Sequence, residues 1–329
     1  MNTLLNITAD TARDIAALEA ELRSGLKLFW RTAATILDDG PIRLAPPDEA
    51  TLSLPRNFFS MLFLYSYYRI GVPAERRILY ASVNQCLRGM VTGCDNLLDD
   101  EYKATLETDL PLPAHRFRSV LDIMVADRVL FAVLTDHCRR HGISVDLAIQ
   151  ASTASLRALT RSGAQEAAEE EGIAERIAPE IVLGRIHHDK TGVLFQSPWA
   201  VPFVLEAHLP PEAATVQEAL FQVGIGCQIL DDLVDLFRDV RQQRHNYVAS
   251  VIVHREPPEL WQQLQALLPT DQTPDRLYAG WPDFAARLKM EAMTTIEQGL
   301  RALFFDRHHD LVHPAAMFVA SRIGVPVAN

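Results

Sequence analysis

Residues 221–235 read Phe-Gln-Val-Gly-Ile-Gly-Cys-Gln-Ile-Leu-Asp-Asp-Leu-Val-Asp. The stretch is apolar until its end, where Asp231, Asp232 and Asp235 stand among Ile, Leu and Val. Asp231 and Asp235 are one helical turn apart and share a face, while Asp232 lies about 100° round the helix. Carboxylates in apolar helical sequence are costly unless a positive group meets them. The stretch therefore predicts a buried helix that presents acids to a cation.

A second acidic segment, Asp-Asn-Leu-Leu-Asp-Asp-Glu, occupies residues 95–101. Asp95 and Asp99 share a helix face in the same way. Magnesium takes oxygen ligands and is usually held by one or two carboxylates together with substrate phosphates. Two such segments predict a Mg²⁺–diphosphate site. Its candidate metal ligands are Asp95, Asp99, Asp100, Asp231, Asp232 and Asp235.

The overall composition excludes several classes of protein. The net charge of −11 leaves no basic surplus to neutralise nucleic-acid phosphates. No apolar run reaches the roughly 18 residues of a membrane-spanning helix, and no secretory signal is visible at the N-terminus. The four cysteines form no CxxC pair, which argues against a zinc site or a disulfide framework. We expect a cytoplasmic protein with no integral membrane segment and no nucleic-acid partner.

The residue pattern predicts helices throughout. Ala, Leu, Glu, Arg and Gln dominate, and alternating β-branched runs are absent. Pro and Gly clusters punctuate the chain without forming a strong linker, so residues 1–329 are predicted to make one all-α domain. We expect helices at about 9–38, 54–70, 74–101, 115–141, 145–163, 175–189, 190–207, 212–240, 257–267, 281–304 and 314–322.

Over about residues 50–255 the chain resembles the trans-isoprenyl diphosphate synthases and the wider class I terpene synthase superfamily. Residues 221–235 look like that family's second aspartate-rich motif, with its upstream glycines and glutamine. Residues 190–195, Lys-Thr-Gly-Val-Leu-Phe, resemble its Lys-Thr motif. The resemblance implies an all-α bundle around a deep central cavity, a homodimer, and three Mg²⁺ ions bound with a prenyl diphosphate.

The resemblance also implies roles for individual residues. Lys190 would contact the allylic diphosphate, with Thr191, Gln228 and Arg244 as further substrate-binding residues. Asp95, Asp99, Asp231, Asp235 and Lys190 would be catalytic. The neighbouring His187 and His188 do not form a metal pair, because adjacent helical residues diverge by about 100°.

The first acidic segment fits the family pattern less closely than the second. The family reads Asp-Asp-x-x-Asp, whereas a start at Asp95 gives Asp-Asn-x-x-Asp. A start at Asp99 pairs it with Asp100 and Lys103, and would place Asp95 against the hydrocarbon cavity, where an unpaired carboxylate is unfavourable. We therefore prefer the register that begins at Asp95.

The basic residues that hold a second diphosphate in the family are reduced here. Its Gly-Gly-Lys-Arg motif corresponds to residues 53–57, in which Arg56 alone could serve. A second diphosphate would have to rely on Arg56, Arg88, Arg116 or Arg118. Three functions stay open: prenyl transfer after Mg²⁺-dependent ionisation, which we prefer; cyclisation of one prenyl diphosphate by a class I terpene synthase; and an inactive regulatory subunit of a synthase heterodimer.

Overall fold

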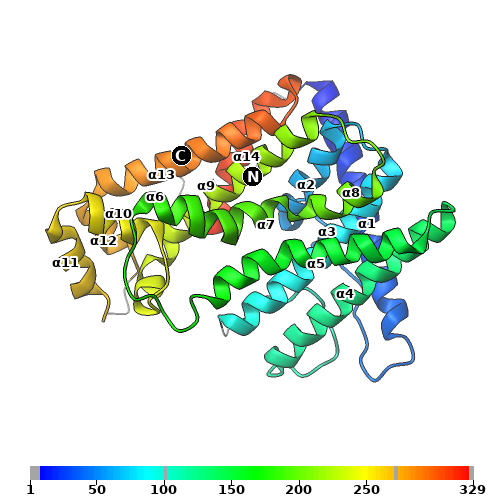
Figure 1. Cartoon of the computed structure of the whole chain (residues 1–329), viewed down its shortest axis with the longest axis horizontal. Coiled ribbons are helices and arrows are strands. Elements are labelled where there is room, and N and C mark those ends of the chain that lie inside the picture. The colour runs from blue at the N-terminus through cyan, green and yellow to red at the C-terminus, as the bar shows by residue number, and fades with distance from the viewer. Residues whose placement is uncertain (1–7, 100–101, 270–272, 326–329) are drawn as a thin grey trace. The chain divides into compact units, whose positions relative to one another are not determined.

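The computed structural model describes residues 8–99, 102–269 and 273–325, which form helices and turns and no β-strand (Figure 1). The prediction of an all-α fold is confirmed. The chain forms two compact units: unit 1 comprises Met1–Leu159 and Ser197–Ala213, and unit 2 comprises Thr160–Gln196 and Ala214–Asn329. The single domain expected from the sequence stays a prediction.

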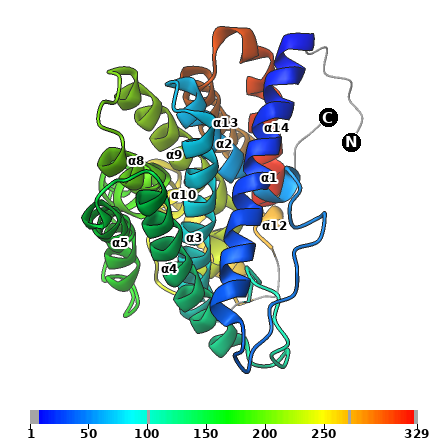
Figure 2. The same ribbon diagram turned by 90° about the vertical axis from the view of Figure 1, so that its right-hand side faces the viewer.

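Unit 1 is built on three long helices that lie side by side (Figure 2). Helix α1 buries Leu18, Leu22 and Leu26, whose spacing of four places them on one face. Gly25 of α1 lies so close to α3 that a Cβ there would stand 2.5 Å from the Cβ of Ala81. The helices of the unit are α1 (Ala9–Leu37), η1 (Pro55–Asn57), α2 (Phe58–Arg69), α3 (Ala74–Leu98), α4 (His115–Arg140), most of α5 (Val145–Ala167), η3 (Ser197–Trp199) and α8 (Ala200–Leu205).

Unit 2 is built around α9, which contains the stretch 221–235. Gly226 of α9 lies against α13, where a Cβ would meet Cγ1 of Ile296 at 2.5 Å. Gly192 likewise leaves room for the ring of Phe221, so the glycines of the motifs permit close packing on α9. The helices are α6 (Pro179–Ile181), η2 (Val182–Gly192), α7 (Val193–Gln196), α9 (Glu212–Arg241), α10 (Tyr247–Arg255), α11 (Pro258–Leu267), α12 (Asp275–Gly280), α13 (Pro282–Leu303), η4 (Asp306–Leu311) and α14 (Val312–Ile323).

Most helices begin and end close to the predicted residues, and the differences fall in unit 2. Helices α10 and α12 were not expected, because both are short. The segment 182–192, expected as parts of two α-helices, is a π-helix with the wider i→i+5 bonding, such as Val193 N–H to the His188 carbonyl. Within the described ranges, no helix is both long and apolar enough to cross a membrane.

Candidate functional site

Helix α9 presents its acidic residues to different surroundings. Asp231 is exposed to solvent, whereas the Asp232 side chain is only 1% exposed. Asp235 is half-buried and pairs with Arg238, and Asp239 is buried. The difference follows from the helical spacing of 100° per residue, which turns Asp231 and Asp232 to different sides of α9.

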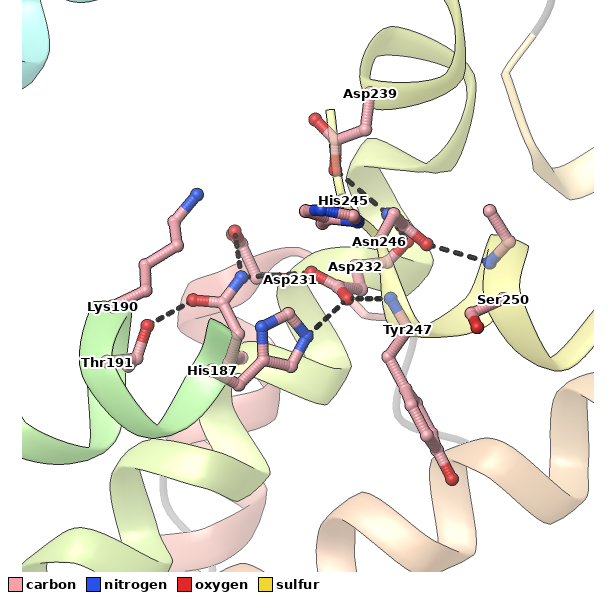
Figure 3. Close-up of polar contacts among 12 residues, drawn as sticks. His187, Lys190, Thr191, Asp231, Asp232, Asp239, His245, Asn246, Tyr247 and Ser250 are labelled. Carbon is pink, nitrogen blue, oxygen red and sulfur yellow. Dashed lines mark hydrogen bonds and ion pairs between the residues drawn. The ribbon is translucent and has the colours of Figure 1, made fainter. Parts of the chain in front are cut away.

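Asp232 is a buried acceptor at which three elements meet (Figure 3). Its Oδ2 accepts hydrogen bonds from His187 Nε2 of η2, at 2.8 Å, and from the backbone N–H of Tyr247 in α10. Its Oδ1 accepts from Gln228 Nε2 at 2.9 Å. Because these donors occupy both oxygens, the geometry favours a positioning role for Asp232 over the direct metal contact expected from the sequence.

The π-helix η2 carries Lys190 and Thr191 to the same region of unit 2 (Figure 3). The Thr191 hydroxyl donates to Gln228 Oε1, and Gln228 Nε2 lies 3.5 Å from Asp231 Oδ2. Thr191 and Gln228, expected to bind substrate, thus form a chain of hydrogen bonds that leads to the acids. π-helical segments occur often at functional sites.

Lys190 is paired with an acid in this structure. Its Nζ lies 2.9 Å from Oε1 of Glu166, near the end of α5. Burial alone would favour the neutral amine, but the Glu166 carboxylate, followed by Asp232 and Asp239, raises the pKa of Lys190 above its ordinary value. Lys190 is therefore a fixed positive charge beside the acids of α9.

Two carboxyl groups on α9 have raised pKa values. Desolvation, reinforced by the charge of Asp232, raises the pKa of Asp231 to about 6, although the side chain reaches solvent. Desolvation and Asp232 also raise the pKa of Asp239 to about 7, against a hydrogen bond from Asn246 Nδ2 at 2.9 Å that favours the carboxylate. Both groups lie in a negative environment that a bound cation would relieve.

The first acidic segment lies at the C-terminal end of α3, in unit 1. Asp95 is exposed, and Asp99 caps the helix by donating its N–H to the Asp95 carbonyl at 2.9 Å. Asn96 is buried and binds the main chain of Lys103 in both directions, at 2.9 and 3.1 Å. The helix ends before Asp99 and Lys103 could share a face, which supports the register that begins at Asp95. The predicted ligand Asp100 lies outside the described residues.

The predicted arginines have varied surroundings. Arg56 is exposed, while Arg88 Nη1 donates to Asn57 Oδ1 at 3.0 Å and so contacts the segment before α2. Arg244 is half-buried, and its main chain is fixed by two bonds, from its N–H to the Asp239 carbonyl at 2.8 Å and from Arg176 Nη1 to its carbonyl at 3.2 Å. Arg88 therefore has a structural contact in addition to any role with substrate.

Several residues of this region were not expected from the sequence. His187 was set aside because it pairs poorly with His188, yet its partner is Asp232. Glu166 was not among the predicted site residues and lies beyond the end of the helix expected at 145–163. Asn246 caps α10 by accepting from Ala249 N–H at 2.9 Å, and an Asn before a short apolar run is a recognisable helix-start signal.

The acids of α9 suit magnesium as a partial ligand set. In the parts of the chain that the structure describes, no three His, Cys, Asp or Glu side chains are grouped to hold a metal ion. Magnesium does not need such a cage, because it commonly combines one or two carboxylates with waters and substrate phosphates. Asp231, an exposed residue of α9, can supply such a carboxylate. The carboxylates at the end of α3 lie at the negative end of the helix dipole, and the last turn of α3 contains no basic residue to offset them. A cation there would be favourable.

Solved structures of similar fold include a polyprenyl synthase from Roseobacter denitrificans, with 16% identity, coverage of 95% of this chain and 98% of that one, and a TM-score of 0.57. The chain has the fold of the polyprenyl synthases. An octaprenyl pyrophosphate synthase from Helicobacter pylori matches at 14% identity, 95% and 98% coverage and a TM-score of 0.57. A Caulobacter crescentus polyprenyl synthase, complexed with calcium and isoprenyl diphosphate, matches at 13% identity, 94% and 98% coverage and a TM-score of 0.59.

No protein-family model and no curated protein sequence matches the chain. The likeness in fold that the sequence motifs predicted is nevertheless confirmed. It extends over nearly the whole chain, beyond residues 50–255 on which the resemblance was first seen.

Proposed function

We propose that this chain is a Mg²⁺-dependent enzyme that releases diphosphate from an allylic prenyl diphosphate and joins the allylic group to an acceptor through a carbon–carbon bond. One observation carries the proposal: Asp231 of α9 is exposed beside a buried acceptor, Asp232, to which η2, with its Lys190 and Thr191, is bonded. The fold is that of proteins described as polyprenyl synthases. One of them is described as a complex with a divalent cation and isoprenyl diphosphate.

The proposed chemistry begins with cleavage of the C–O bond, whose electron pair leaves with the diphosphate. Bound Mg²⁺ would neutralise the charge that develops on this leaving group. Asp231 and Asp235 of α9, with Asp95 and Asp99 of α3, are the carboxylates proposed to hold it. The sequence prediction of three ions bound with one diphosphate stays a prediction.

Lys190 and Arg244 are proposed to bind the same diphosphate by charge-assisted hydrogen bonds. Lys190 keeps its proton at neutral pH because its pKa is raised. A diphosphate would have to compete with Glu166 for the ammonium group, so the Glu166 contact would be exchanged for substrate oxygens on binding. Until substrate arrives, the Glu166 contact holds the lysine in place.

Cyclisation of a single prenyl diphosphate is the second candidate function. Among the arginines that could hold a second diphosphate, Arg88 donates to Asn57, and Arg118 is buried and donates to the carbonyls of Thr108, Leu110 and Pro111. These internal contacts favour a reaction that needs one diphosphate only. In either case the allylic cation must be kept from water by an apolar pocket.

A product assay separates the candidates. Purified protein is incubated with Mg²⁺ and geranyl, farnesyl or geranylgeranyl diphosphate, with and without isopentenyl diphosphate. Longer diphosphates that require isopentenyl diphosphate indicate prenyl transfer, and a hydrocarbon or alcohol from the allylic substrate alone indicates a cyclase. No diphosphate release under any condition contradicts the proposal, and activity restored only by a partner chain indicates the regulatory subunit.

We further propose that the protein is a homodimer that pairs through α4. Phe117, Val120, Met124 and Phe131 lie on one face of this helix and are all exposed, Phe117 by 52% and Met124 by 62%. Large apolar side chains that recur in exposed positions along one helix face are what a contact with a second copy would cover. Replacing Phe117 and Met124 with Glu is expected to shift the mass in multi-angle light scattering from dimer to monomer, and a monomeric wild type would refute the pairing.

A further inference from the structure

His187 is a buried histidine whose ring forms one hydrogen bond with the described residues. Its side chain is 1% exposed, and Nε2 lies 2.8 Å from Asp232 Oδ2. A carboxylate can only accept, so Nε2 carries the hydrogen. The other ring nitrogen, Nδ1, has no hydrogen-bond partner among the described residues. Because a buried polar ring is costly without its bond, the Asp232 contact accounts for the presence of a histidine here.

The contact is one of two side-chain hydrogen bonds, here called rungs, that join η2 to α9 in unit 2 (Figure 3). His187 and Thr191 are four residues apart in η2 and bond to Asp232 and Gln228, which are four apart in α9. In a helix with i→i+5 bonding, residues four apart lie near the same face, so both contacts are made from one side of η2. Gln228 Nε2 joins the two rungs by its 2.9 Å bond to Asp232 Oδ1.

Two rungs fix the rotation of η2 about its axis, where one would not. That rotation sets the direction of Lys190, which lies between the rungs in sequence and reaches Glu166 instead of α9. Asp232 also accepts the N–H of Tyr247, so the same carboxylate sets where α10 begins. Loss of the His187 donor would therefore loosen η2 and the start of α10 together.

We propose that His187 is a positioning residue that acts through Asp232 to hold Lys190 and Asp231 in the orientation needed for diphosphate release. The expected effect on diphosphate release rests on the proposed function. The expected effect on the structure of η2 and α10 does not, because it is measured on the unliganded protein. Partners that orient the ligands of a metal site typically contribute 10–100-fold in affinity or activity.

The test compares four variants in the full-length protein. His187→Leu removes the donor, His187→Gln can place an N–H where Nε2 lies, and His187→Asn is too short to do so. His188→Leu is the matched control, because this half-exposed neighbour bonds to the adjacent Asp189 and packs on Phe221. Amide exchange of Tyr247 is measured without substrate, and kcat and KM of Mg²⁺-dependent diphosphate release are measured separately.

We expect His187→Leu to speed exchange at Tyr247 and to lower kcat/KM about 10–100-fold, whereas His187→Gln and His188→Leu behave like the wild type. Unchanged exchange and kinetics in His187→Leu, or equal damage in His187→Gln, overturn the inference. If His187→Leu does not fold, the Gln and Asn variants decide, since equal behaviour of the two contradicts a donor role. If the wild type releases no diphosphate, the proposed function fails, and the exchange data alone decide the positioning role.

Discussion

Two acidic segments, 95–99 at the end of α3 and 231–235 in the last third of α9, each combine an exposed acid with a buried polar residue. The buried residue is an amide in the first segment and a carboxylate in the second. In each, the first acid is exposed and the residue after it is buried and bonds to main chain further along, Asn96 to Lys103 and Asp232 to Tyr247. Asn96 both accepts and donates, whereas Asp232 accepts from three donors.

This difference changes how the altered first segment is understood. From the sequence, Asn96 is a departure from the family's Asp-Asp-x-x-Asp pattern. In the structure its amide matches a partner with both an N–H and a carbonyl, which a carboxylate could not match. Asp232 instead needs His187, Gln228 and the Tyr247 N–H around it. The second position of each segment thus has a structural role, and the exposed first position is the one that we propose to contact the metal ion.

The largest expected effect comes from the exposed first position. Asp231→Asn should lower Mg²⁺-dependent diphosphate release by about 10²–10³-fold or more, roughly 3–4 kcal/mol in activation free energy, with the thermal unfolding midpoint kept or raised. Asp136→Asn, which removes an exposed acid paired with Arg140 on α4, is the control for loss of charge. Full activity of Asp231→Asn in a direct diphosphate assay would contradict the assignment.

The next effect tests the buried second position of α9. Asp232→Asn would set an amide NH₂ against the donors that now bond to the carboxylate, and we expect a loss of about 2–4 kcal/mol in the free energy of unfolding. Asp235→Asn, which removes the half-exposed pair with Arg238, is expected to cost about 0–1 kcal/mol. Equal losses in denaturant titrations of the two variants would show that Asp232 is no structural acceptor.

The fold and part of the site follow from local sequence. Helices α1, α4 and α13 were predicted within one or two residues because their apolar periodicity is long. Asp231 and Lys190 were predicted as site residues because their motifs are contiguous. The π-helix was not predicted, and the two hydrogen bonds that it makes to α9 have partners that residues 182–192 alone do not reveal.

The partners of those residues could not be predicted for the same reason. Glu166 is 24 positions before Lys190 by residue number, and no motif in the sequence links the two. His187 was assessed against its sequence neighbour, whereas its partner Asp232 is 45 residues away. Contacts between segments far apart in the chain set these roles, and sequence spacing carries no record of them.

A third prediction exchanges the chemistry of the first segment for that of the second. Asn96→Asp restores the family pattern but sets a carboxylate oxygen against the Lys103 carbonyl, 3.1 Å from the present donor. We expect a loss of about 1–3 kcal/mol in the free energy of unfolding at neutral pH. Gln262→Glu, at an exposed position of α11, controls for the amide-to-acid change and should stay within about 0.5 kcal/mol. A more stable Asn96→Asp protein in urea titration would refute the match between Asn96 and Lys103.

The smallest effect concerns Asp239, the buried acid one turn beyond Asp235. Its pKa is about 7 in the folded protein, raised by desolvation and by Asp232 from 3.8. Between these values the folded protein holds more protons than the unfolded chain, so the stability due to this group falls as pH rises from about 4 to about 7. The slope from one proton is about 1.4 kcal/mol per pH unit at most.

Asp239→Asn removes that titration and leaves an oxygen that can accept from Asn246. The variant should therefore gain stability relative to the wild type as pH rises across this interval, while below pH 4 the two should differ little. The Asp239 charge also contributes to the raised pKa of Asp231, so the substitution lowers that pKa as well and adds to the difference in the same direction. If the difference in unfolding free energy between the two proteins does not change with pH, Asp239 does not titrate with a raised pKa. Asp239 would then not belong to the negative environment that a cation is proposed to relieve.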